Sequence, residues 1–99
     1  MQVLSKRTLR EFWTIYPDAE TPLSAWYRIV TKAVWTKPND VKEQFGASVD
    51  FIGDSRAIFD IGGNKYRLIA RMVYGRYYRV MVKFIGTHEE YDKVNAETV

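Results

Sequence analysis

Two runs in the second half of the chain alternate between apolar and polar residues, and this alternation constrains the fold more than any other feature. The runs are Lys65–Tyr74 and Tyr77–Ile85, and a shorter apolar run, Arg56–Ile61, precedes them. Alternation with a period of two places successive side chains on opposite faces of a strand. Gly62-Gly63-Asn64 and Gly75-Arg76 lie between the runs, and these residues tolerate the backbone conformations of tight hairpins. The segment is predicted to form three antiparallel strands.

The alternation predicts one apolar and one cationic sheet face. The apolar face would carry Tyr66, Leu68, Ala70, Met72, Tyr74, Tyr78, Val80, Val82 and Phe84. The opposite face would carry Lys65, Arg67, Ile69, Arg71, Val73, Tyr77, Arg79, Met81, Lys83 and Ile85. From Arg56 to Lys83 there are seven Lys or Arg residues and one acid, Asp60. A solvated face usually mixes charges because like charges on neighbouring strands repel. We therefore interpret this face as one that meets an anion, above all a nucleic-acid backbone; an ordinary polar outer face is the alternative.

Length and composition exclude several classes of protein. A chain of 99 residues is expected to form one domain, spanning residues 1–99. It has no cysteine and one histidine, which excludes disulfides and argues against a zinc site made by protein ligands alone. No run of apolar residues is long enough to span a membrane, and the N-terminus lacks the apolar segment of a signal peptide. The expected location is the cytoplasm.

Two helices are predicted before the strands. Ser5 is the expected N-cap of the first helix, whose apolar stripe is Leu9, Phe12, Trp13 and Tyr16, and Pro17 would end it. Thr21 and Pro22 would cap and begin the second, whose stripe is Leu23, Trp26, Tyr27 and Val30. The helices are expected to form a hairpin that covers the apolar sheet face and leaves the cationic face free.

Shorter elements are predicted on either side of these helices and strands. Met1–Leu4 is expected to be an edge strand, and a short helix should begin near Pro38 and end at Gly46. Val49–Ile52 is expected to be a further strand. The pattern of Glu89–Val99 does not distinguish a helical turn from a loop.

The densest chemistry follows the last predicted strand, in the sequence GTHEEYDK, residues 86–93. It offers an imidazole, a phenol and an amine from His88, Tyr91 and Lys93. RNA carries its own nucleophile, the ribose 2′-hydroxyl, so an enzyme that cuts it needs a base, an acid and cations near the phosphate. Histidine suits the first two roles near neutral pH. A lone histidine at a strand end is also commonly structural, and Gly62-Gly63-Asn64-Lys65 is better explained as a hairpin turn than as a phosphate-binding loop.

Four segments carry a resemblance to a known family: TLREFW, PDAETPLSAWYR, FDIGGNKYRLIAR and GTHEEYDKV. Together they resemble the HigB toxins, ribosome-dependent mRNA interferases of the RelE/ParE superfamily. The resemblance implies an α+β, RelE-like fold, with two N-terminal helices packed on one face of a mostly antiparallel four- to five-stranded sheet. It also implies mRNA cleavage in the ribosomal A site by 2′-hydroxyl attack, without a metal or other cofactor. The implied partner is a HigA-type helix-turn-helix antitoxin, through which alone the toxin would be brought to operator DNA.

The resemblance and the strand periodicity together define candidate site residues. The candidates for catalysis are His88, Tyr91, Arg67 and Lys93, with the general base left open between His88 and Tyr91. The candidates for RNA binding are Lys65, Arg71, Arg79, Lys83 and Asp92. Two alternatives stay open at this point: a ParE-like poison of DNA gyrase, which the superfamily fold would equally support, and an RNA-binding module without catalysis.

Overall fold

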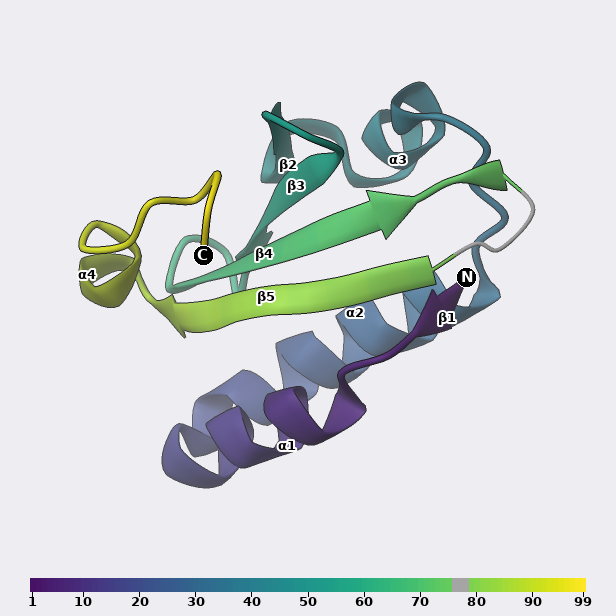
Figure 1. The fold of residues 1–99 in the computed structure, drawn as a ribbon. Coiled ribbons are helices and arrows are strands. Elements are labelled where there is room, and N and C mark those ends of the chain that lie inside the picture. Colours follow the sequence, from purple (N-terminus) through teal and green to yellow (C-terminus); the bar gives the residue numbers. More distant parts are fainter. Residues whose placement is uncertain (76–78) are drawn as a thin grey trace.

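A computed structural model, which describes residues 1–75 and 79–99, contains a five-stranded sheet with α1 and α2 packed on one face (Figure 1). The strands are β1 (Gln2–Val3), β2 (Val49–Ile52), β3 (Arg56–Ile61), β4 (Tyr66–Val73) and β5 (Arg79–Thr87), in the order β1-β5-β4-β3-β2. The helices are α1 (Lys6–Ile15), α2 (Glu20–Lys32), α3 (Pro38–Phe45) and α4 (His88–Tyr91), with 3-10 turns η1 (Pro17–Ala19) and η2 (Gly46–Ser48). β1 runs parallel to β5 and the other neighbouring strands are antiparallel. The predicted fold class is confirmed.

The core lies between the sheet and the helices, and aromatic rings hold it together. Phe59 of β3 is fully buried, with its ring centroid 5.4 Å from that of Trp26 in α2 and 4.9 Å from that of Phe45 in α3. Both contacts are edge-to-face, the geometry that the ring quadrupoles favour. Phe12 of α1 meets Tyr66 of β4 in the same way, with ring centroids 5.3 Å apart, so the predicted apolar faces of the helices and of β4 meet as expected. Trp13, Tyr16 and Tyr27, expected in the core, are only half-buried at its rim.

The two predicted helix starts differ from those observed. Ser5 occupies the N-cap position of α1, but its hydroxyl makes no cap bond and instead accepts a hydrogen bond from the Val82 backbone N–H at 3.2 Å. It thus ties the start of α1 to β5. The second helix begins at Glu20 rather than at Pro22, because η1 runs directly into it. Pro22 fits within the first turn, where backbone N–H groups have no intrahelical acceptor.

A β-bulge in β5 shifts the predicted alternation of side chains. Ala70 lies opposite Val82 and Ile69 lies opposite Phe84, so Lys83 is the extra residue. Beyond the bulge, Ile85 packs against the core, and Phe84 turns to the other side of the sheet. The predicted faces of Phe84 and Ile85 were therefore wrong, because one inserted residue reverses the alternation that follows it.

The sheet face opposite α1 and α2, here called the outer face, is partly covered. Arg56 on this face donates hydrogen bonds to the backbone oxygens of Ala96 at 3.2 Å and Val99 at 2.7 Å. The C-terminal segment, residues 92–99, thus folds back over the sheet (Figure 1). Such cover accounts for the burial of Ile58 and Ile69, which lie on the outer face by their register. The expectation that this face is free was wrong.

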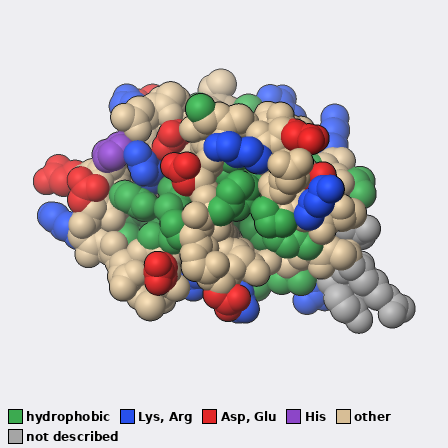
Figure 2. All heavy atoms as spheres, turned by 90° about the horizontal axis from the view of Figure 1, so that it is seen from above, with side chains coloured by type: hydrophobic (Ala, Val, Ile, Leu, Met, Phe, Trp, Pro, Cys, Tyr) green, Lys and Arg blue, Asp and Glu red, His purple; other side chains and the backbone are tan. Residues whose placement is uncertain are grey.

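The outer face also mixes charges more than the sequence suggested. Figure 2 shows Lys and Arg side chains interspersed with Asp and Glu around exposed apolar groups on this side of the molecule. Asp60 and Asp54 each lie within ion-pair distance of an arginine of β4. The cations are therefore local features of this face and do not form a uniform positive surface.

Part of the predicted hairpin, Arg76 with Tyr77 and Tyr78, lies outside the described residues. Gly75, which precedes it, has a φ of 84°. No helix among residues 1–75 and 79–99 is long and apolar enough to cross a membrane.

Replacing Leu68 by Ala should lower the free energy of unfolding by about 2–5 kcal/mol, because Leu68 is completely buried beneath the helices. Urea denaturation followed by tryptophan fluorescence measures this change. Ile15→Ala is the matched control: the Ile15 side chain lies in α1 at 73% exposure and its truncation should cost less than about 0.5 kcal/mol. Equal losses in the two variants would contradict the placement of the core.

Candidate functional site

The C-terminal end of β5 presents the predicted chemical groups on the short helix α4. Thr87 is its N-cap: the Glu90 backbone N–H donates to Thr87 Oγ1 at 3.2 Å, and the Thr87 backbone N–H donates to Glu90 Oε1 at 2.9 Å. These two reciprocal hydrogen bonds form a capping box. The box fixes the start of α4 and thereby the positions of His88 and Tyr91 on it. The T-x-x-E spacing of residues 87–90 is the sequence signature of this capping box, a signal that the predicted site does not include.

His88 faces the hairpin turn between β3 and β4. Its Nε2 atom lies 3.1 Å from Oδ1 of Asn64, and its ring centroid lies 6.4 Å from that of Tyr91. The sequence assigned Asn64 only to the turn. Its proximity to His88 could not be predicted because the two residues are 24 positions apart.

Arg67 of β4 lies between an acid and an aromatic ring. Its Nε atom is 3.1 Å from Asp60 Oδ1 on β3, the residue directly opposite, and its guanidinium carbon is 4.9 Å from the ring centroid of Tyr91. The approach to Asp60 lacks hydrogen-bond geometry, so the contact is an ion pair. The Arg67 and Asp60 side chains are only 22% and 28% exposed, respectively. The structure therefore brings three of the predicted site residues together, with Arg67 and His88 each in contact with the ring of Tyr91.

Phe84 and Gly86 form the floor beside Tyr91. The Phe84 ring centroid is 6.4 Å from that of Tyr91, and a Cβ atom added at Gly86 would lie 2.5 Å from Phe84 Cζ. The Phe84 ring therefore lies directly against Gly86, and it can do so only because that residue has no side chain. Gly86 is also the residue opposite Arg67 in the β4–β5 pairing.

The other candidates are spread around this cluster. Arg71 lies on the outer face of β4, with a long ion pair of 3.5 Å to Asp54. Arg79 begins β5 opposite Val73, and Lys83 is the exposed extra residue of the bulge. Asp92 and Lys93 are exposed in the turn after α4. Arg56, which the sequence analysis counted but did not select, binds the C-terminal segment instead.

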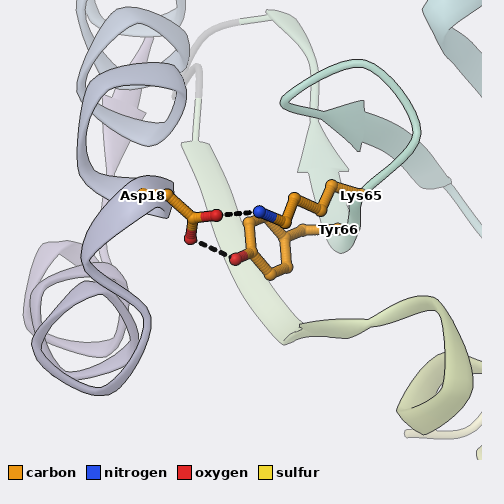
Figure 3. Close-up of polar contacts among 3 residues, drawn as sticks. All are labelled: Asp18, Lys65 and Tyr66. Atoms are coloured by element: carbon orange, nitrogen blue, oxygen red, sulfur yellow. Dashed lines mark hydrogen bonds and ion pairs between the residues drawn. The ribbon is translucent and has the colours of Figure 1, made fainter.

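Lys65 and Tyr66 belong to a different contact, on the helix side of the sheet. The Lys65 ammonium and the Tyr66 hydroxyl both donate to the carboxylate of Asp18 in η1 (Figure 3). Lys65 therefore does not extend over the outer face as predicted. These residues line a groove of about 890 Å³, whose opposite wall is Thr87–Glu90. His88 thus lines this groove, and its ring also contacts Tyr91.

The hydrogen bonds at Asp18 shift the pKa values of both Asp18 and Tyr66. The hydrogen bond from Lys65, followed by that from Tyr66, lowers the pKa of Asp18 below its ordinary value of 3.8. The hydrogen bond to Asp18, followed by burial, raises the pKa of Tyr66 from 10.0 to about 12. The pair is therefore most strongly held when the carboxylate is charged and the phenol is neutral.

Within residues 1–75 and 79–99, no group of three or more His, Cys, Asp or Glu side chains is placed to hold a metal ion. The chemistry that the cluster offers is proton transfer by an imidazole or a phenol, beside a guanidinium that can stabilise negative charge.

Comparison with known proteins places this site in a family. Residues 19–94 match the family model of the HigB toxin, described as the RelE-like toxic component of a toxin–antitoxin system. The chain is 29% identical over 93 residues to the "mRNA interferase toxin HigB" of Escherichia coli K12, which covers 93% of this chain and 88% of that protein. It is 30% identical over 95 residues to the "mRNA interferase HigB" of Escherichia coli O6:H1, which covers 95% and 91% of the two chains.

The contribution of Tyr66 to stability should depend on pH. The difference in unfolding free energy between the wild type and Tyr66→Phe should be largest between about pH 4 and 10, where Asp18 is charged and the phenol is neutral. It should shrink below pH 4, as Asp18 gains its proton, and between pH 10 and 12, as the phenol loses its proton. Urea titrations across this range measure it.

The control for this experiment is the Asp18→Asn background. There the same Tyr66→Phe change should give a difference with much weaker pH dependence, because no carboxylate remains to accept the bond. A flat difference in the wild-type background would contradict the Asp18–Tyr66 contact.

Proposed function

The chain belongs to the HigB family of RelE-like toxins, and on this premise we propose that it is a toxin of a toxin–antitoxin system that acts as an endoribonuclease on mRNA. The observation that carries the proposal within the structure is the cluster of His88, Tyr91 and Arg67 at the end of β5. A DNA gyrase poison is not favoured, because the relatives carry the name mRNA interferase.

The cluster supports a cleavage that uses the 2′-hydroxyl of the RNA as nucleophile. His88 or Tyr91 takes the proton of this hydroxyl, and the oxygen forms a bond to the adjacent phosphorus. Arg67 stabilises the negative charge that develops on the phosphate oxygens. A protonated group then gives its proton to the departing 5′-oxygen, so the products are a 2′,3′-cyclic phosphate and a free 5′-hydroxyl. Lys93, exposed beyond α4, is a further candidate for charge stabilisation.

Asp60 has a double effect on Arg67 in this mechanism. It attracts the guanidinium and holds it beside Tyr91, which reduces the reorientation needed during the reaction. It also offsets part of the positive charge, so a scissile phosphate must compete with it. None of the described residues accepts a hydrogen bond from the Arg67 guanidinium. Its Nε atom is buried, so the donors left for a phosphate are those of the two terminal nitrogens.

The cations outside the cluster are proposed to bind RNA on the ribosome. Arg71, Arg79 and Lys83 lie on or beside the outer face, along the two strands that lead to the cluster. Contacts to phosphates by such residues contribute affinity and register without reading the base sequence. Lys65, whose ammonium donates to Asp18 on the helix side of the sheet, and Asp92, exposed in the turn after α4, are proposed as further RNA contacts. The Asp92 carboxylate repels phosphate, so its part is to accept hydrogen bonds from ribose or base groups.

The toxin's antitoxin partner is proposed to be of the HigA helix-turn-helix type. An antitoxin could cover the outer face with an acidic segment, or bind α1 and α2 and inhibit by its bulk. Under either arrangement the complex no longer fits the ribosome, and DNA is contacted through the antitoxin.

Substitution of the proton-transfer candidates should separate chemistry from binding. If the group that is removed transfers a proton, His88→Gln or Tyr91→Phe should reduce the cleavage rate by roughly 10²–10⁴-fold. Ribosome binding by both variants should stay near normal. Primer extension on stalled ribosome complexes measures cleavage, and co-sedimentation measures binding. Wild-type cleavage should persist with a chelator, at magnesium sufficient to keep the ribosome intact.

Arg67→Ala should lose on the order of 10²-fold in cleavage through loss of charge stabilisation. Wild-type rates in both His88→Gln and Tyr91→Phe would show that the site is elsewhere. A wild type that binds ribosomes but cuts no mRNA would instead favour the RNA-binding module.

Removal of the strand cations should weaken binding more than chemistry. Arg71→Ala, Arg79→Ala and Lys83→Ala should each weaken association and lower the slope of log affinity against log salt by about 0.7–0.9 per lost phosphate contact. Arg7→Ala is the control, because Arg7 lies on α1 with its side chain 91% exposed. An equal effect of Arg7→Ala would contradict the outer face as the binding surface.

A further inference from the structure

We propose that Asn64 is a positioning residue for the cleavage reaction: it fixes the orientation and tautomer of His88 so that Nδ1 is the nitrogen that exchanges a proton with RNA. This inference rests on the proposed function and assigns a side chain that lies outside the candidate set. It starts from the 3.1 Å contact between Asn64 Oδ1 and His88 Nε2.

The hairpin turn does not itself require an asparagine at position 64. Gly62 and Gly63 supply the positive φ angles of the turn, at 63° and 73°. Ser55 is the only described non-glycine residue with a positive φ, so Asn64 has an ordinary backbone conformation. The backbone alone thus leaves the choice of this side chain unexplained, and its contact with His88 supplies a reason.

The chemistry of the contact determines where the imidazole proton lies. A carboxamide oxygen can only accept a hydrogen bond, so a neutral His88 facing Asn64 Oδ1 carries its hydrogen on Nε2. The lone pair is then on Nδ1, which no described residue contacts by a hydrogen bond. Nδ1 is therefore the atom available to take the 2′-hydroxyl proton.

Few other contacts hold the ring in place. Among the described residues, Asn64 is the only hydrogen-bond partner of the His88 side chain, and the Tyr91 ring supplies a looser edge contact. The charged groups around this side of the molecule come from four elements: Asp18 from η1, Lys65 from the turn, Arg67 from β4, and Glu89 and Glu90 from α4. None of them bonds the imidazole, so removal of Asn64 leaves it without a polar partner.

The tautomer can be measured directly because His88 is the only histidine in the chain. In ¹⁵N-labelled protein, two-bond ¹⁵N–¹H correlation spectra at about pH 8.5, where a histidine is ordinarily neutral, report the ratio of the two tautomers. Asn64→Ala should shift this ratio roughly 2- to 12-fold toward Nδ1–H, the range expected for loss of one net hydrogen bond. Asn64→Asp keeps the accepting oxygen and should retain the wild-type tautomer. An unchanged ratio in Asn64→Ala would overturn the proposal.

Single-turnover cleavage at saturating ribosome concentration tests whether Asn64 acts through His88. Asn64→Ala should slow cleavage on the order of 10-fold in the wild type, yet cause no further loss in His88→Gln. Asn64→Asp should restore most of the rate at saturation. Any repulsion between the new carboxylate and RNA should only raise the ribosome concentration needed for half-saturation. Equal losses from Asn64→Ala in both backgrounds would mean that Asn64 contacts RNA itself, which refutes the positioning role.

Two controls keep the outcomes distinct. The thermal midpoint of Asn64→Ala should stay within roughly 10 °C of the wild type, because only one hydrogen bond in an exposed turn is lost. If His88→Gln cleaves at the wild-type rate, the catalytic assignment of His88 fails and the positioning role fails with it. The tautomer ratio still reports whether the Asn64 contact forms, so this failure is distinguishable from loss of the contact alone.

Discussion

The bulge at Lys83 is the constraint on which the geometry of the candidate site depends. A regular β5 would direct Phe84 into the core and Ile85 outward. With one extra residue, Ile85 joins the core, while Phe84 and Gly86 share the face that carries Arg67. The bare backbone at Gly86 then admits the Phe84 ring, against which Tyr91 packs at the end of α4. The placement of the aromatic groups beside Arg67 thus follows from a single irregularity in strand pairing.

The polar contacts of the candidate site orient its side chains and still leave them partly accessible. The half-buried pairing of Arg67 with Asp60 carries a desolvation cost, and a pair in which both charges stay partly accessible contributes little net stability. Its value is geometric, because it holds a cation beside Tyr91 before RNA arrives. His88, whose ring also contacts Tyr91, has a comparable polar contact with Asn64. Under the proposed function, these two contacts orient the groups for which cleavage requires a defined geometry.

Local pattern predicted much of this structure, and long-range contacts account for what it missed. The boundaries of β3 and β2 and the extent of α3 were predicted as observed, since turn glycines and Pro38 mark them in the sequence. The bulge was not predictable, because its register depends on two strands together. The cover over the outer face was missed for a similar reason: Arg56 meets Ala96 across 40 residues, and no periodicity links them. The family resemblance names Arg67, His88 and Tyr91 as candidates but gives no sign of Asp60 or Asn64, the polar side chains that lie against two of them.

Under the proposed function, the partial cover of the outer face narrows the path by which RNA would reach the cluster. The C-terminal segment occupies the side of the face near Arg56, and β1 flanks β5 on the other side of the sheet. The uncovered cations therefore lie along β4 and β5. Arg71 and Arg67 are four residues apart on one face of β4, which at roughly 3.3 Å per residue separates them by about 13 Å. A short single-stranded segment lying along these strands can place one phosphate at Arg71 and a later one at Arg67, beside Tyr91 and His88. Single-stranded mRNA suits such a path better than a rigid duplex, because its backbone can follow the twist of the sheet.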